Sequence, residues 1–238
     1  MDWSVPEWVP LTATRVARRS LVLSAVVCRA SIESGVTDPE AQSLHGHIID
    51  WLTRLSLWDE VEPGEETMLR APLGLLASSD MIQASWYVEG LAVLAWALKY
   101  LEFPVSGEQV DAHTVTDALW FLNESAVDII TSAELRSPAE LEACREFFYA
   151  IHSRLRDHVR NDVPRDFTRW VEEEWLKLLG IDAGALFAHS DLGIDGKSFS
   201  ETDNERLQEV MAITLERHRA IIWLFEGYAS YSETPVDT

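Results

Sequence analysis

The sequence predicts an all-α fold, a single compact multi-helix domain around a central buried helix. Apolar residues between about 81 and 101 cover the whole circumference of a helix, a pattern typical of a helix buried on every side. Several other segments place apolar residues at steps of three and four, and capping residues precede them. An Asp-Gly pair favours one small β-hairpin near residues 192–199.

The expected domain organisation is simple. At 238 residues the chain is long enough to bury a substantial core. No stretch has the composition of a linker, so we expect one helical domain over residues 14–238. Residues 1–13 are expected to form an N-terminal arm, which Pro6 and Pro10 keep extended.

Three helices are expected before the central one. The first covers about residues 14–34, whose basic and apolar parts resemble a signal peptide, although an acidic, Trp-containing leader precedes them. The second covers about residues 37–55, because Thr37 and Glu40 have the spacing of a capping box. A short acidic helix then begins at Pro63.

The central helix, about residues 81–101, can be capped by Ser79 or Asp80. A membrane-spanning helix is the alternative, but the uncharged run 90–98 is much shorter than the roughly 20 residues that a bilayer requires. Glu89 is the single charge in the middle of this apolar stretch. A buried core helix is therefore the preferred interpretation.

Beyond residue 104, the expected elements are one or two short helices within 105–133 and longer helices at about 138–160, 166–180 and 204–228. Ser137 and Glu140 form a second capping box, which precedes the first of the long helices. The hairpin is expected at Asp195-Gly196. Its acidic neighbours do not fit a calcium-binding loop, because Gly193 stands where an oxygen ligand is required.

Neither the cysteines nor the histidines have the spacing of a metal site. Cys28 and Cys144 stand apart among apolar neighbours, as buried reduced thiols of a cytoplasmic protein do. His45 and His47 point to opposite sides of their expected helix and cannot bind one ion together. We therefore expect no metal, no cofactor and a cytoplasmic location.

The chain is strongly acidic, with 40 Asp and Glu against 19 Lys and Arg and a net charge of -21. This charge repels phosphate backbones, so nucleic acid is excluded as an expected partner, and no membrane partner is expected either. The same field attracts a basic protein over long range. An alternative is that the charge only maintains solubility. The ten tryptophans predict a large aromatic core or an aromatic binding surface.

Motifs for catalysis are missing, since no Walker loop, GxSxG elbow, HExxH helix, CxxC pair or dinucleotide fingerprint occurs. The candidate catalytic residues are Glu89, Glu216 and His218. A carboxylate among aromatic residues can have a raised pKa and act as general acid or base, with His218 as its partner. The structural alternative is that Glu89 accepts hydrogen bonds from an arginine and a tryptophan and fixes two helices in register.

The candidate binding residues are Trp86, Arg217, Arg219 and Trp223. Several of the candidates belong to segments that resemble a known bacterial family, domain of unknown function 4272. The segments are SWYVEGLAVLAWALKYL (85–101), LRSPAELEACREFFYAIHSRLRD (135–157) and LERHRAIIWL (215–224). The most specific features are Trp86 with Glu89, the triplet 216–218 followed by Trp223, and the closing Asp237-Thr238.

This resemblance covers about residue 14 to the end of the chain. It implies a single helical domain of unassigned activity, found in soluble bacterial proteins, and no catalytic residue. In many relatives a Trp-Asp pair lies close to the C-terminus, where this chain has Tyr231 and Ser232.

Two classes of function follow from the sequence. The first is a non-enzymatic interaction protein, such as an acidic antagonist or immunity partner of a basic protein. The second is a small hydrolase or transferase that uses Glu89, Glu216 and His218.

Overall fold

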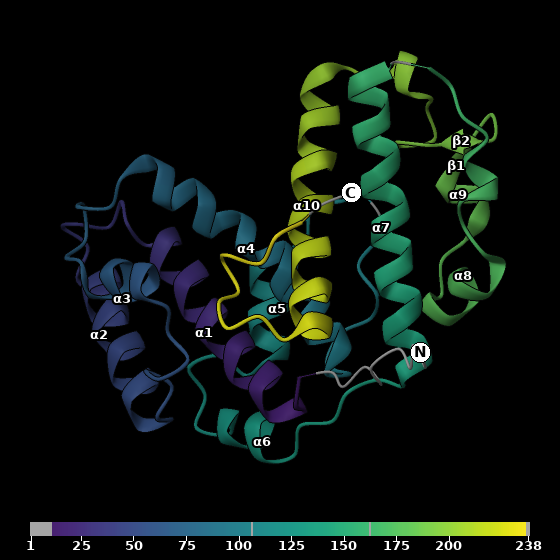
Figure 1. Cartoon of the computed structure of the whole chain (residues 1–238). Helices are drawn as coiled ribbons and strands as arrows, with labels where there is room; N and C mark the ends of the chain where they lie inside the picture. Colours follow the sequence, from purple (N-terminus) through teal and green to yellow (C-terminus); the bar gives the residue numbers. More distant parts are fainter. Residues whose placement is uncertain (1–10, 106, 162, 237–238) are drawn as a thin grey trace, which may run out of the picture.

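A computed structural model describes residues 11–105, 107–161 and 163–236, and it confirms the predicted all-α class (Figure 1). The helices within these residues are α1 (Ala13–Ser31), α2 (Pro39–Arg54), α3 (Pro63–Arg70), α4 (Ser78–Ala97), α5 (Ala112–Ala118), α6 (Ala126–Thr131), α7 (Pro138–Asn161), η1 (Phe167–Arg169), α8 (Glu173–Leu179), α9 (Ala183–Leu186), η2 (Phe199–Glu201) and α10 (Asn204–Glu226). Most of the predicted arm 1–13 lies outside the described residues, and the arm remains a prediction.

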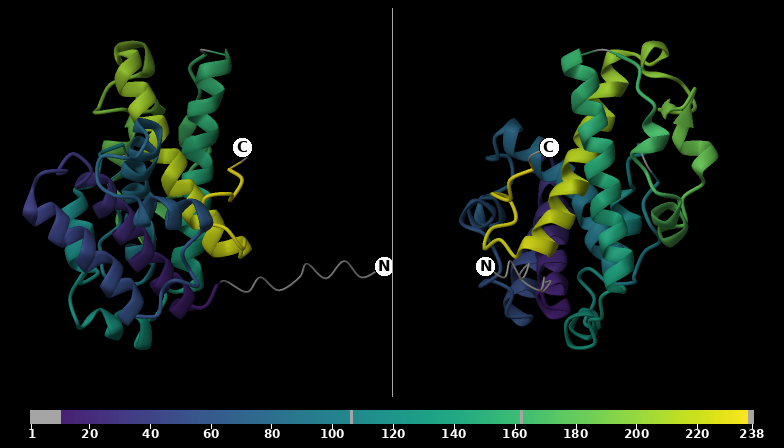
Figure 2. Two further views of the ribbon diagram at one scale, coloured as in Figure 1. Left: turned by 90° about the vertical axis from the view of Figure 1, so that its left-hand side faces the viewer. Right: turned by 45° about the vertical axis from the view of Figure 1, so that its right-hand side comes forward.

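The long helices pack in a row in which α4 lies between α1 and α10, and α7 covers the other side of α10. Helices α2 and α3 pack on α1, and α8 packs on α7. Figure 2 shows from two further directions that α7 and α10 remain neighbours. No helix of the described residues has the length and hydropathy needed to cross a bilayer.

Helix α4 is the central helix, and it is buried on all sides over residues 87–98. The first turns of α4 are not buried on all sides, since Ile82 is 59% exposed. Ala77 precedes the helix at the N-cap position, so neither Ser79 nor Asp80 caps it. The helix ends four residues early because Lys99 adopts a left-handed conformation, with a φ of 69°. The amides of residues 99 and 100 then bond back into the last turn, as in a Schellman motif.

Helices α7 and α10 agree with the sequence prediction. The amide of Glu140 donates to the Ser137 hydroxyl, and the Glu140 carboxylate accepts from the Ser137 amide, so the capping box is confirmed. The Asp203 side chain caps α10, and Gly227 ends it with a φ of 68°.

Three other predicted boundaries were wrong. Helix α1 ends at Ser31 rather than near residue 34, and the N-cap of α2 is Asp38 rather than Thr37. The predicted helix 166–180 is broken into η1 and α8. The amide of Phe167 donates to the carbonyl of Ser190 in the hairpin, and Glu172 is extended, so the chain cannot continue one helical path between them.

The predicted hairpin is present in a modified form. Asp195-Gly196 forms a tight turn closed by an antiparallel bridge between Ile194 and Lys197. The paired strands lie just before this turn, β1 (Phe187–Ala188) against β2 (Asp191–Leu192). Their turn contains His189 and Ser190, both with positive φ. Neither residue type is a usual signal for such a turn, which explains why the sequence did not indicate these strands.

Candidate functional site

Glu89 of α4 and Arg217 of α10 form an ion pair in the interior of the protein. Each side chain is 1% exposed. Arg217 donates from Nε and Nη2 to Glu89 Oε2, at 2.9 and 2.7 Å. The other carboxylate oxygen, Oε1, accepts from the backbone amide of Val110 at 3.1 Å. The partner of the single buried charge on α4 is therefore an arginine, as the structural interpretation of Glu89 required. The second donor is the Val110 amide and not the predicted tryptophan.

The same guanidinium also anchors the segment between α4 and α5. Arg217 Nη1 donates to the carbonyl of Val105 at 2.7 Å, and Nη2 donates to the carbonyl of Glu108 at 2.5 Å. All three nitrogens of the guanidinium and both oxygens of Glu89 thus have partners. Burial raises the pKa of Glu89, against the opposing effect of Arg217, and burial lowers the pKa of Arg217.

Glu216 precedes Arg217 on α10 but has a different partner. Its two oxygens accept from Arg219 Nη1 at 2.8 and 3.1 Å, one turn further along the same helix. Burial raises the pKa of Glu216, and Arg219 opposes that shift. Glu216 is therefore held by a local ion pair, separate from the one at Glu89.

His218 bonds to another histidine rather than to a carboxylate. Its Nδ1 lies 3.0 Å from Nδ1 of His152 on α7, and both rings are buried. Burial lowers the pKa of His218 to about 3 and that of His152 to about 4, so both rings are neutral near pH 7. Among the described residues, no hydrogen bond or ion pair joins His218 to Glu89 or Glu216.

His218 also borders a small pocket between α7 and α10. The pocket has a volume of about 240 Å³, and its other lining residues are Arg145, Glu146, Tyr149, Ile222 and Glu226. Of the three candidate catalytic residues, His218 is the one that borders this pocket.

The four candidate binding residues do not form one surface. Arg217 is buried in the ion pair, and Trp223 is completely buried, packed edge-on against Tyr231 with ring centroids 5.7 Å apart. Arg219 is held by Glu216, and Trp86 is half-buried on α4. Two of the candidate binding residues on the last helix, Arg217 and Trp223, therefore lie in the core.

A second buried polar cluster was not identified from the sequence. Arg19 of α1 is 1% exposed and pairs with both carboxylate oxygens of Glu65 on α3. It also donates to the carbonyl of Glu60 at 3.1 Å. The sequence does indicate a buried charge here, because Arg18-Arg19 interrupts an apolar helix. The same residues, however, resemble the basic start of a signal peptide.

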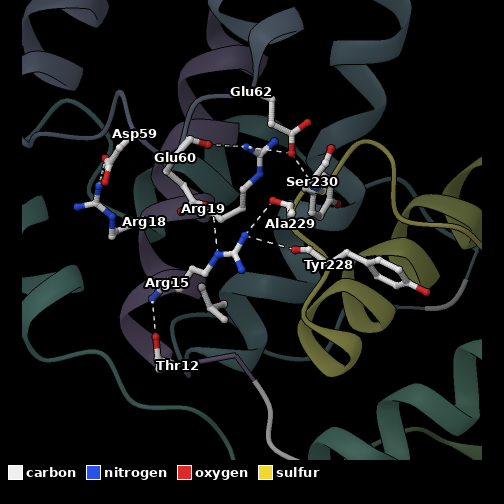
Figure 3. A network of polar contacts seen from close by, with 12 residues as sticks. Thr12, Arg15, Arg18, Arg19, Asp59, Glu60, Glu62, Tyr228, Ala229 and Ser230 are labelled. Carbon is white, nitrogen blue, oxygen red and sulfur yellow. Dashed lines mark hydrogen bonds and ion pairs between the residues drawn. The ribbon is translucent and has the colours of Figure 1, made fainter.

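The cluster at Arg19 holds the C-terminal segment in place, as Figure 3 shows. Arg15 of α1 donates to the carbonyls of Tyr228 and Ala229, at 3.3 and 3.0 Å. The Glu62 carboxylate accepts from the backbone amides of residues 231 and 232. Helix α1 and the loop before α3 therefore fix the chain after α10.

Tyr231 fills the space between these elements. Its ring is completely buried, edge-on to Tyr87, with the Arg19 guanidinium 5.0 Å from its centroid. The Tyr231 hydroxyl has no hydrogen-bond partner among the described residues. It lies 1.9 Å from the position that a β-carbon on Gly90 would occupy, and the carbonyl of Glu216 lies 3.1 Å from that position. Only glycine fits where α4, α10 and the tail meet.

The thiols and the candidate metal ligands give no further site. Cys28 and Cys144 are free, and burial raises the pKa of both thiols. Cys144 is buried as predicted, whereas Cys28 is only half-buried. Within residues 11–105, 107–161 and 163–236, no group of three or more His, Cys, Asp or Glu side chains could hold a metal ion.

The fold and the site define a class of protein, an α-helical domain in which buried arginines pair with carboxylates to join helices. This protein belongs to the family described as Domain of unknown function (DUF4272), whose sequence model matches residues 3–170. The match includes Trp86 and Glu89 but ends before α10, so the triplet 216–218 and the tail lie outside it. The chain matches no curated protein and no solved structure.

Proposed function

We propose that this protein acts by binding a basic protein, as an antagonist or immunity partner, and not by catalysis. The observation that carries this proposal is that the strongest candidate for chemistry, Glu89, is already paired. Its oxygens accept from Arg217 and from the Val110 amide, and its side chain is 1% exposed. A general acid or base must instead reach the reacting group.

The other candidate groups support the same proposal. A general base works best with a pKa near the working pH, and burial lowers the pKa of His218 to about 3. Glu216 pairs with Arg219. The buried charges therefore fix α4, α10 and the segment between α4 and α5 relative to one another.

The net charge of -21 supplies the attraction for a basic partner. Such a field raises the rate of encounter with an oppositely charged protein and makes that rate fall with ionic strength. We also propose a cytoplasmic location, because the two cysteines remain free, as is usual in a reducing compartment.

The test is capture of partners from native lysate on the immobilised protein at low and at high salt, followed by titration calorimetry with the purified partner. The expected result is a basic protein recovered in stoichiometric amount at low salt and released as salt rises. Recovery of no stoichiometric partner, or only of partners that are acidic and insensitive to salt, would overturn the proposal.

The alternative, a small hydrolase or transferase that uses Glu89, Glu216 and His218, is favoured by one observation. His218 borders the pocket of about 240 Å³ between α7 and α10. Under that alternative, Glu89→Gln abolishes an activity and leaves the fold intact. If Glu89→Gln only lowers stability, the enzymatic alternative fails.

A further inference from the structure

One surface segment carries acidic residues without cations. Between Lys99 and Arg136 there is no Lys or Arg. The seven acidic residues of this segment are Glu102, Glu108, Asp111, Asp117, Glu124, Asp128 and Glu134, and all are exposed. Among the described residues, two of them have ion pairs, Glu134 with Lys99 at 2.9 Å and Glu124 with Arg54 at 3.9 Å. The other five form no ion pair among the described residues, although Glu108 lies near the charge of Arg217.

This acidic segment contains an exposed tryptophan. Trp120 is 42% exposed and has a φ of 50°, an unusual conformation for a bulky side chain. The turn that presents it is firmly held, because Phe121 packs edge-on against Trp51 and Trp51 Nε1 donates to the carbonyl of Asn123 at 3.2 Å. The amide of Asn123 also donates to the carbonyl of Trp120. Helix α2 thus holds the turn while the Trp120 ring remains accessible.

Apolar surface continues on both sides of this turn. Leu122 is the apolar residue of a groove of about 600 Å³ against the second half of α2. The other side chains of the groove are polar or charged, and they include Arg54, which pairs with Glu124. Val127 is exposed on α6, which lies at one end of the molecule (Figures 1 and 2). We call the residues 117–128 with this groove the Trp120 surface. It combines exposed apolar side chains with the exposed carboxylates of residues 117, 124 and 128.

The face of the Trp120 ring has no cation over it among the described residues, in contrast to other aromatic rings of the protein. The half-buried Trp58, for example, already has the Arg70 guanidinium 4.0 Å from its centroid. The Trp120 ring pairs edge-on with that of Tyr100, with centroids 6.3 Å apart. A lysine or arginine from another molecule could therefore stack on Trp120, an interaction that strengthens when water is excluded.

We infer that the Trp120 surface binds a lysine- or arginine-rich segment of a partner protein, with an apolar side chain of that segment in the Leu122 groove. This inference rests on the proposed function and names the surface that performs it. Charge complementarity selects the occupant, because the exposed carboxylates of this segment attract cations and repel both nucleic acid and a second copy of this chain. The exposed apolar side chains supply the contact that persists when salt screens the charges.

The test uses a fluorescein-labelled, lysine-rich peptide with a single leucine, titrated by fluorescence anisotropy at low salt. Asp117→Lys with Asp128→Lys reverses two charges at the Trp120 surface. Glu173→Lys with Glu174→Lys reverses two exposed charges on α8, beyond α7, and changes the net charge equally. The expected result is a loss of affinity of about tenfold or more for the first pair and of less than about threefold for the second.

The aromatic part is tested separately with Trp120→Asn, because asparagine tolerates a positive φ. Trp170→Ala is the matched control, since Trp170 is 37% exposed and lies in another part of the chain. We expect about a fivefold loss for Trp120→Asn and no loss for the control. Circular dichroism and the urea midpoint confirm that each variant is folded.

The outcomes separate the inference from the proposed function. Equal losses for both charge-reversal pairs would overturn the inference, because net charge alone would then explain binding. Unchanged affinity of Trp120→Asn would exclude the aromatic contact. If the unmodified protein does not bind the peptide but captures a basic protein from lysate, the inference fails and the proposed function stands. If capture from lysate also fails, the proposed function itself fails.

Discussion

Arg217 donates to Glu89 from two of its nitrogens, and the contacts around this pair join three separate parts of the chain. Glu89 lies on α4, Arg217 lies on α10, and the carbonyls that Arg217 binds belong to Val105 and Glu108, between α4 and α5. Because a buried charge without its partner is unfavourable, the pair stabilises one arrangement of these parts and opposes any other. The structural role of Glu89 follows from this geometry.

The first prediction concerns removal of one charge of this pair. Glu89→Gln leaves Arg217 buried without a counter-charge, and the free energy of unfolding should fall by about 3–5 kcal/mol. Urea denaturation followed by circular dichroism measures the change. Glu134→Gln, which removes the exposed partner of Lys99, is the control and should change stability little. Equal effects of the two substitutions would contradict a structural role for the buried pair.

The second prediction concerns Gly90. A β-carbon at this position overlaps the Tyr231 hydroxyl and crowds the backbone of α10. Gly90→Ala should therefore lower the free energy of unfolding by about 1–3 kcal/mol or more. Gly46 offers a matched control, because a β-carbon there meets nothing within 4 Å in the middle of α2. Gly46→Ala should stabilise the protein by about 1 kcal/mol. A loss of stability for Gly90→Ala together with a gain for Gly46→Ala would support the close packing of Gly90 against Tyr231.

The third prediction distinguishes the ring of Tyr231 from its hydroxyl. Tyr231→Ala removes a completely buried ring and should cost about 3–5 kcal/mol of stability. Tyr231→Phe removes a hydroxyl that has no hydrogen-bond partner among the described residues, so stability should stay the same or rise by about 1 kcal/mol. Thermal and urea denaturation of both variants measure these effects. A large loss for Tyr231→Phe would show that the hydroxyl has a role in the folded state.

The fourth prediction concerns pH and the histidine pair. The pKa of His218 is about 3 and that of His152 about 4 in the folded protein, below the ordinary histidine value of about 6.5. The unfolded chain therefore takes up protons below pH 6.5 that the folded chain does not. Stability should be highest above about pH 6.5 and should fall as the pH decreases through this window, by roughly 2 kcal/mol per ring at pH 5.

Urea denaturation at a series of pH values tests this dependence, with His152→Gln/His218→Gln as the comparison. Arg145 and Arg156 add positive charge near the rings and act in the same direction as burial. The double variant should lose much less stability than the unmodified protein between pH 7 and pH 5. An identical pH dependence would show that the pair does not determine acid sensitivity in this range.

Local signals in the sequence predicted most of the helices. The capping box at Ser137 and Glu140 fixes the start of α7, and the apolar residues of α4 identify the central helix, because both effects act within a few turns. The boundaries that were wrong depend on distant contacts. The break between η1 and α8 reflects a bond from Phe167 to Ser190, which no local pattern reveals.

The same distinction applies to the candidate site. Glu89 could be selected because a lone charge in an apolar helix needs a partner, and Arg217 was among the candidates. The pairing of His218 with His152 depends on how α7 meets α10, so sequence spacing could not distinguish it from a pairing with a carboxylate. Tyr231 was missed as a core residue because its burial results from the return of the tail to α1 and α4.

The most direct test of the central claim is the affinity of folded Glu89→Gln protein for the lysine-rich peptide. If the buried pair maintains the fold and the surface binds the partner, the affinity should stay within about twofold of the unmodified value, although stability is lower. A loss of affinity of about tenfold or more, with stability unchanged, would contradict the claim and assign Glu89 a direct part in function.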